Sequence, residues 1–114
     1  MLIAFTVALL IQAQQQQGFR PYFASPVTTP ILVDACKSFV PTAPDVEANF
    51  CTGYILATYD QLTASYRICP RSAMGPVQIV AIATKYLRDN PRMWSRHPNV
   101  VLKAAFSEAA PPCR

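Results

Sequence analysis

The four cysteines constrain this chain more than any other feature; they are Cys36, Cys51, Cys69 and Cys113. All four follow an apolar run, residues 2–11, which has the length of a signal-peptide core and is too short to span a bilayer. Export leads to an oxidising compartment, where an even number of cysteines predicts disulfides. No pair has the C-x-x-C spacing and the chain has one histidine, so neither a metal site nor a redox site is expected. The pattern therefore predicts a small exported domain held by two disulfides.

This pattern divides the chain into three segments. Residues 1–13 are predicted to be a cleaved signal peptide, although no Lys or Arg precedes the apolar run; the alternative is a buried first helix. Residues 14–28, rich in Gln and then in Pro, Thr and Ser, are predicted to be a disordered linker. Residues 29–114 are predicted to be the folded domain. No later segment is apolar for long enough to cross a membrane, so we expect no membrane contact after cleavage.

Proline, threonine and aspartate mark the starts of four predicted helices. Thr29 is expected to cap the first helix and Asp45 the second. Pro76 and Pro98 stand at the starts of the third and fourth. The predicted buried residues are, in chain order, Ile31, Leu32, Ala35, Phe39, Phe50, Tyr54, Ala57, Tyr59, Leu62, Ile79, Val80, Ala83, Tyr86, Leu87, Val101, Leu102, Ala105, Phe106 and Ala109. Since no alternating pattern is present, the predicted fold class is all-α, a small four-helix up-down bundle.

This topology selects one disulfide pairing, although spacing alone leaves three. In an up-down bundle the end of the first helix meets the start of the second, which brings Cys36 close to Cys51. The ends of the second and fourth helices meet at the opposite pole, which brings Cys69 close to Cys113. We therefore expect one bridge at each end of the bundle.

Four sequence segments also point to a family. They are CTGYILATYD (residues 51–60), CP (69–70), VQIVAIATKYLRDNP (77–91) and AAFSEAAPPC (104–113). Together, in this order and spacing, they resemble the Rap/Tai family of type VI secretion immunity proteins, over nearly the whole predicted domain. Two departures are visible: Ala57 stands where a second glycine is usual, and Gly75 and Pro76 replace the commoner Val-Thr before the glutamine.

The resemblance implies a function without catalysis. Members of this family are periplasmic, helical and disulfide-bonded, are often homodimers, and bind peptidoglycan amidase effectors. This chain is therefore expected to occlude the active site of such an amidase, with no cofactor. The alternative is a periplasmic housekeeping protein, such as a small stress chaperone or a cell-envelope binding protein. The six acidic residues of this chain are scattered in a basic background. This pattern argues against a chaperone that is activated by acid.

The residues themselves also argue against an enzyme. His97, the one histidine, has no free cysteine to activate if the disulfides form, and it is expected to begin a helix instead. Asp60 has no second carboxylate close in sequence for acid–base chemistry.

Five residues of the shared segments are expected to be structural: Gly53, Tyr54, Asp60, Gln78 and Tyr86. Gly53 would allow two helices to approach closely. The two tyrosines would fill positions in or near the core. Asp60 and Gln78 would hydrogen-bond to loop backbone.

Partner binding is expected in the exposed segment 88–99. Its candidate residues are Arg88, Arg92, Trp94, Arg96 and His97, with help from Arg71 on a neighbouring loop. Trp and Arg dominate interface energetics, and the formal charge of +4 favours an acidic partner. Nucleic acid is not expected, because the chain is exported and has no reading motif. The alternative is that Trp94 packs onto the end of the bundle and the arginines are only solvated.

Overall fold

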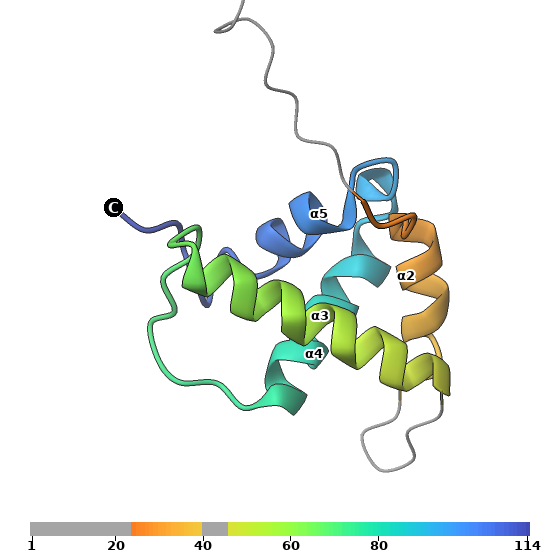
Figure 1. The fold of residues 1–114 in the computed structure, drawn as a ribbon, viewed down its shortest axis with the longest axis horizontal. Helices are drawn as coiled ribbons and strands as arrows, with labels where there is room; N and C mark the ends of the chain where they lie inside the picture. Colours follow the sequence, from red (N-terminus) through yellow and green to blue (C-terminus); the bar gives the residue numbers. More distant parts are fainter. Residues whose placement is uncertain (1–23, 40–45) are drawn as a thin grey trace, which may run out of the picture.

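The computed structural model describes residues 24–39 and 46–114. This part of the chain forms four α-helices and one 3₁₀ helix, with no strand (Figure 1): α2 (Thr29–Cys36), α3 (Val46–Ala64), α4 (Pro76–Asp89), η1 (Pro91–Met93) and α5 (Pro98–Ala105). The predicted all-α class with four helices is confirmed. The predicted signal peptide, most of the predicted linker and the predicted cap Asp45 lie outside the described residues.

α3 is the longest helix and packs against α2, α4 and α5. Its buried residues follow a three- or four-residue spacing and are Ala48, Cys51, Ile55, Tyr59 and Leu62. The predicted face is confirmed at Tyr59 and Leu62 but wrong at Ala57 and Phe50, which are exposed. The helix is apolar on most sides, so its periodicity does not select one face. The disulfide from Cys51 to Cys36 of α2 instead fixes which face of α3 turns toward the core.

α4 and α5 bury the stripes that their sequences predict. The buried residues are Ile79, Val80, Ala83 and Leu87 on α4, and Val101, Leu102 and Ala105 on α5. Phe106, directly after α5, is fully buried and meets the ring of Tyr59 edge-on, with 5.1 Å between centroids. Tyr86 is half-buried, at the edge of the core.

The start of α2 differs from the prediction by one residue. Thr28 is the capping residue, and its side chain accepts a hydrogen bond from the Ile31 amide. Thr29 is buried instead, and its hydroxyl donates to the carbonyl of Arg96, which lies 67 residues further along the chain. Ile31 is 49% exposed, so its predicted place in the core is wrong. The first turn of α2 is therefore tied to the segment before α5.

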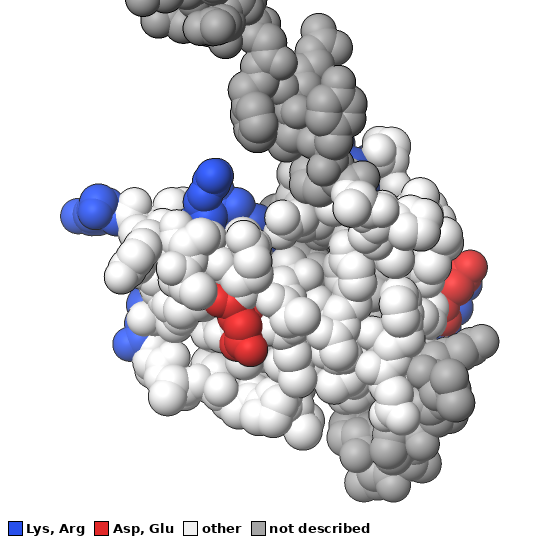
Figure 2. Space-filling model, viewed as in Figure 1, with Lys and Arg blue, Asp and Glu red and all other residues white. Residues whose placement is uncertain are grey.

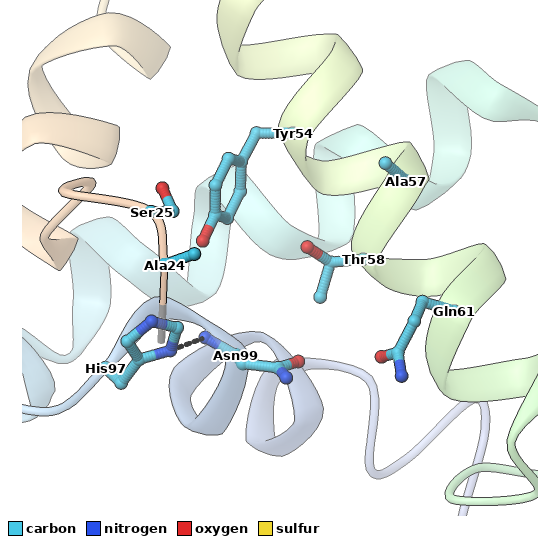
Figure 3. A pocket seen from close by; sticks show the side chains of 8 residues that line it. All are labelled: Ala24, Ser25, Tyr54, Ala57, Thr58, Gln61, His97 and Asn99. Carbon is cyan, nitrogen blue, oxygen red and sulfur yellow. Dashed lines mark hydrogen bonds between the residues drawn. The ribbon is translucent and has the colours of Figure 1, made fainter. Parts of the chain in front are cut away.

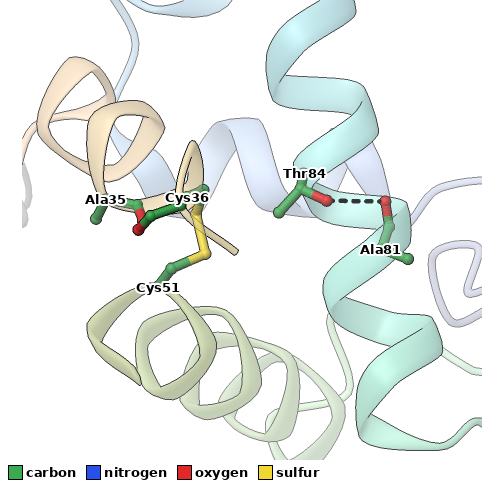
Figure 4. The surroundings of a disulfide bond; sticks show 6 residues. Ala35, Cys36, Cys51, Ala81 and Thr84 are labelled. Atoms are coloured by element: carbon green, nitrogen blue, oxygen red, sulfur yellow. Dashed lines mark hydrogen bonds between the residues drawn. A yellow bond between two sulfur atoms is a disulfide. The ribbon is translucent and has the colours of Figure 1, made fainter. Parts of the chain in front are cut away.

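Both predicted disulfides are confirmed. Cys36 bridges to Cys51 between α2 and α3, with 5.1 Å between Cα atoms (Figure 4). Cys69 bridges to Cys113 with 5.0 Å between Cα atoms. Beside this second bridge, the Cys69 amide donates to the Pro111 carbonyl at 2.7 Å and the Arg71 amide to the Ala109 carbonyl at 3.2 Å. These contacts hold the loop after α3 against the segment after α5.

The described residues contain neither a candidate membrane span nor a candidate metal site. None of the helices in this part of the chain is long and apolar enough to cross a membrane. No group of three His, Cys, Asp or Glu side chains within it could hold a metal ion.

Candidate functional site

The segment between α4 and α5 is wound into successive tight turns. Pro91 cannot continue α4, because it lacks the amide hydrogen that the helix needs. The Asn90 side chain then donates to the Tyr86 carbonyl at 2.9 Å. The Trp94 amide donates to the Pro91 carbonyl at 3.1 Å, and the Arg96 amide to the Met93 carbonyl at 3.0 Å. Residues 90–97, here called the η1 segment, therefore have a defined backbone.

Trp94 anchors this segment to the domain. Its indole N–H donates to the Leu87 carbonyl at 2.7 Å, and its half-buried ring packs against the core. Leu87 lies in the last turn of α4, where carbonyls lack partners within the helix. Of the two predicted alternatives for Trp94, the structure has the one in which the ring packs onto the end of the bundle. The other part of the ring remains accessible to solvent, so a direct contact of Trp94 with a partner stays a prediction.

His97 and Arg96 fix the other end of the η1 segment. His97 is the N-cap of α5, and its Nδ1 accepts a hydrogen bond from the Asn99 amide at 3.1 Å. The prediction that His97 begins a helix is confirmed. The Arg96 carbonyl accepts the hydroxyl of Thr29. The segment is thus held at Trp94, at Arg96 and at His97, through contacts with α4, α2 and α5.

Three arginine side chains project from the η1 segment and the turn before it. Arg88, Arg92 and Arg96 are exposed, and within the described residues none of them forms an ion pair. The nearby Lys85 and Asp89 neutralise each other at 2.7 Å. The hydrogen bond from Lys85 lowers the pKa of the Asp89 carboxyl. The surface that remains is positively charged on a rigid backbone.

Arg71 does not belong to this surface. It lies on the loop between α3 and α4, where its amide pairs with Ala109 beyond the end of α5. The η1 segment lies at the start of α5, and an eight-residue helix is about 12 Å long. Figure 1 shows the α3–α4 loop and the segment between α4 and α5 on opposite sides of the molecule. The prediction that Arg71 assists Arg92–His97 is therefore wrong, because α4 runs between the two loops.

A shallow groove of about 340 Å³ lies between α3 and the start of α5. Its lining residues are Ala24, Ser25, Tyr54, Ala57, Thr58, Gln61, His97 and Asn99. In Figure 3 the side chains of Tyr54, Thr58 and Gln61 point from α3 toward α5. They offer hydroxyl and amide groups but no carboxylate or thiol. All four cysteines of the chain are in disulfides, so a Cys–His nucleophile is unavailable.

The five predicted structural residues have different outcomes. Tyr54 and Tyr86 are half-buried against the core, as predicted, and burial raises the pKa of Tyr54. Gly53 lies on the exposed side of α3, and a Cβ there would have no atom within 4 Å. The predicted close helix approach at Gly53 is wrong. Asp60 and Gln78 are exposed, and neither side chain bonds to loop backbone within the described part.

Comparison with known proteins identifies a family. The family model of the Rap1a immunity proteins matches residues 28–113. The match begins at the capping residue of α2 and ends at the last disulfide cysteine. No curated protein and no solved structure matches the chain.

Proposed function

This chain belongs to the Rap1a immunity proteins, and on that basis we propose that it binds a peptidoglycan amidase delivered by type VI secretion and occludes its active site. Membership gives the chain a non-enzymatic role against a type VI effector. The amidase as target, the blocked cleft and the periplasm as meeting place are parts of the proposal. The family match over residues 28–113 is the observation that carries it.

The η1 segment is the part of the surface that we assign to the amidase. A segment that enters a cleft binds better when its backbone is ordered beforehand, because less conformational entropy is lost on binding. The hydrogen bonds of Trp94 and Thr29 supply that order. Arg88, Arg92 and Arg96 supply charge that can orient an acidic partner. In this arrangement Trp94 supports the contact surface from behind, and His97 positions the start of α5.

Two features support the periplasm as the compartment of this protein. Both disulfides require an oxidising environment, and the apolar run at residues 2–11 suits a signal peptide. A homodimer is also part of the proposal. The exposed side of α3 carries Phe50, Gly53 and Ala57, and the face shown in Figure 2 bears few charges, which suits the packing of a second copy.

The function is tested with the purified, oxidised protein and a peptidoglycan amidase that type VI secretion delivers. We expect a stable complex and loss of peptidoglycan cleavage at equimolar protein. An exported disulfide protein of similar size and charge is the control, and it should leave cleavage unchanged. Binding without inhibition would contradict occlusion of the active site, and absence of binding would contradict the amidase as partner.

The role of the arginines is tested by association kinetics. We expect Arg92→Ala combined with Arg96→Ala to slow association with the amidase by about tenfold at low ionic strength, because electrostatic steering is lost. The effect should shrink as salt is added. The matched control is Arg67→Ala with Arg71→Ala, which removes the same charge from exposed arginines of the α3–α4 loop, on the opposite side of the molecule. An equal loss in the control would show that only net charge matters and would remove the η1 segment from the contact.

A further inference from the structure

A second group of basic and aromatic side chains lies at the end of the molecule that carries the bridge between Cys69 and Cys113. It consists of Tyr66, Arg67, Arg71, Lys103 and Arg114, which we call the Tyr66 surface. Figure 2 shows Lys and Arg side chains gathered at this end, around the C-terminus and the α3–α4 loop. The η1 segment does not include any of these residues.

Tyr66 occupies a backbone position that normally suits glycine. α3 ends in a Schellman motif: the Arg67 amide donates to the Leu62 carbonyl at 2.9 Å, and the Tyr66 amide to the Thr63 carbonyl at 3.1 Å. This motif requires a left-handed residue after the helix, and the φ of Tyr66 is 57°. Within the described residues it is the one non-glycine with positive φ. A side chain with a Cβ is unfavourable there, so the fold alone would be served better by glycine.

The Tyr66 ring does not contribute to the core. Its 79% exposure is the largest among the exposed large hydrophobic residues of the described part. Strained non-glycine residues concentrate at functional sites, and exposed Tyr beside Arg is the composition of interface hot spots. The combination predicted at Trp94, an exposed aromatic ring among arginines, is thus present at Tyr66.

An apolar hollow opens on the same end of the molecule. It has a volume of about 220 Å³ and is lined by Ile68, Val100, Lys103, Ala104, Ser107, Ala110 and Pro112. Val100 is 40% exposed, and Lys103 forms part of the wall. The disulfide and the hydrogen bond from the Cys69 amide to the Pro111 carbonyl fix the backbone next to the lining residues Ile68 and Pro112. A single apolar side chain of a partner would fit such a space.

The charge around the hollow is positive and uncompensated. Arg67 adjoins Ile68, which lines the hollow, and Arg114 lies two residues beyond Pro112, which also lines it; both arginines are exposed. Neither they nor Arg71 and Lys103 form an ion pair within the described residues. Glu108, the nearest acidic residue in sequence to the lining, faces the separate hollow between α4 and α5. Charge complementarity therefore selects an acidic occupant.

We infer that the Tyr66 surface is a second protein-binding surface, which accepts an acidic segment bearing one apolar side chain. The carboxylates would meet Arg67, Arg71 and Arg114, the apolar side chain would enter the hollow, and the exposed Tyr66 ring would contact the segment beside Arg67. This inference goes beyond the occlusion of an amidase by the η1 segment and does not depend on it.

The test is NMR titration of the ¹⁵N-labelled, oxidised protein with a short peptide of Glu and Asp around a central Phe. We expect amide shifts in residues 66–71, 100–104 and 110–114, and weaker binding when Phe is replaced by Gly. Shifts confined to residues 88–97, or none, would overturn the inference. Vesicles of phosphatidylethanolamine and phosphatidylglycerol are the comparison, and preferential binding to them would assign the surface to lipid and overturn it as well.

Tyr66→Gly separates binding from folding. Because it removes both the ring and the unfavourable Cβ, it should raise Tm by roughly 4–8 °C and weaken peptide binding several-fold. Tyr66→Ala is the matched control, since it loses the ring but keeps the Cβ; it should bind as weakly with no such rise in Tm. Unchanged peptide affinity in both variants, or a fall of Tm in Tyr66→Gly, would overturn the inference.

Discussion

Reduction of both disulfides is expected to lower the melting temperature by far more than 10 °C and to leave most of the domain unfolded at 37 °C. The bridge between Cys36 and Cys51 closes a loop of 15 residues and is worth about 3 kcal/mol. The bridge between Cys69 and Cys113 spans 44 residues and is worth about 4 kcal/mol. A domain of this size has a total stability of roughly 5–15 kcal/mol, so losing both contributions exhausts most of it. Circular dichroism melts with and without a reductant measure the effect.

Paired serine substitutions separate the two bridges. We expect Cys69→Ser with Cys113→Ser to lower Tm by more than Cys36→Ser with Cys51→Ser, because the longer loop gains more entropy in the unfolded chain. The reverse order would mean that the strain or contacts of the native state, and not loop closure, decide the stability of this domain.

Trp94→Ala is expected to destabilise the domain by about 2–3 kcal/mol, a fall of roughly 10 °C or more in Tm. The reason is that the half-buried ring leaves the core and the Leu87 carbonyl loses its indole donor. Affinity for the amidase should fall too, because the η1 segment loses its order before binding. Thermal melts and binding titrations on the same preparations test both expectations.

The matched control is Trp94→Phe, which keeps an aromatic ring but removes the N–H donor. It should cost only about 1 kcal/mol, and most of the binding should remain. If Trp94→Ala left Tm unchanged and abolished binding, Trp94 would be a contact residue, and the anchoring role assigned to it here would be wrong.

The regular parts of the fold could be predicted from the sequence, because one apolar stripe dominates each of them. α4 and α5 have such stripes, and their buried residues match the prediction at Val80, Leu87 and Leu102. α3 has no dominant stripe, so the choice between the faces of Phe50 and Ile55 depended on the disulfide to α2. The pairing itself was predictable, because an up-down bundle brings the end of the first helix to the start of the second and the ends of the second and fourth helices to one pole.

The candidate site was predictable only in its charges. Exposure of Arg88, Arg92 and Arg96 follows from their polarity and position. The hydrogen bonds that anchor the η1 segment could not be predicted from the sequence. The bond between Thr29 and Arg96, for example, joins residues that no local pattern relates. Arg71 was grouped with Arg92 because their loops are neighbours along the chain, yet the fourteen residues of α4, about 21 Å of helix, run between these loops.

Tyr66 was missed because its sequence gives no signal of exposure. Tyrosine is intermediate between the buried and the exposed residue types, so its identity alone predicts neither. The one local clue is that the Schellman position after α3 holds no glycine, and this clue becomes visible only with the backbone angles.

The order of the cysteines has a consequence for how the protein is made. Each bridge joins neighbours along the chain, the first cysteine to the second and the third to the fourth. If the chain leaves an export channel N-terminus first, an oxidase that joins cysteines as they emerge produces the native pairing directly, with no step that needs an isomerase. The first bridge can close while α4 and α5 are still inside the channel, whereas the second must wait for both. Maturation of the α2–α3 end would then precede that of the Tyr66 end.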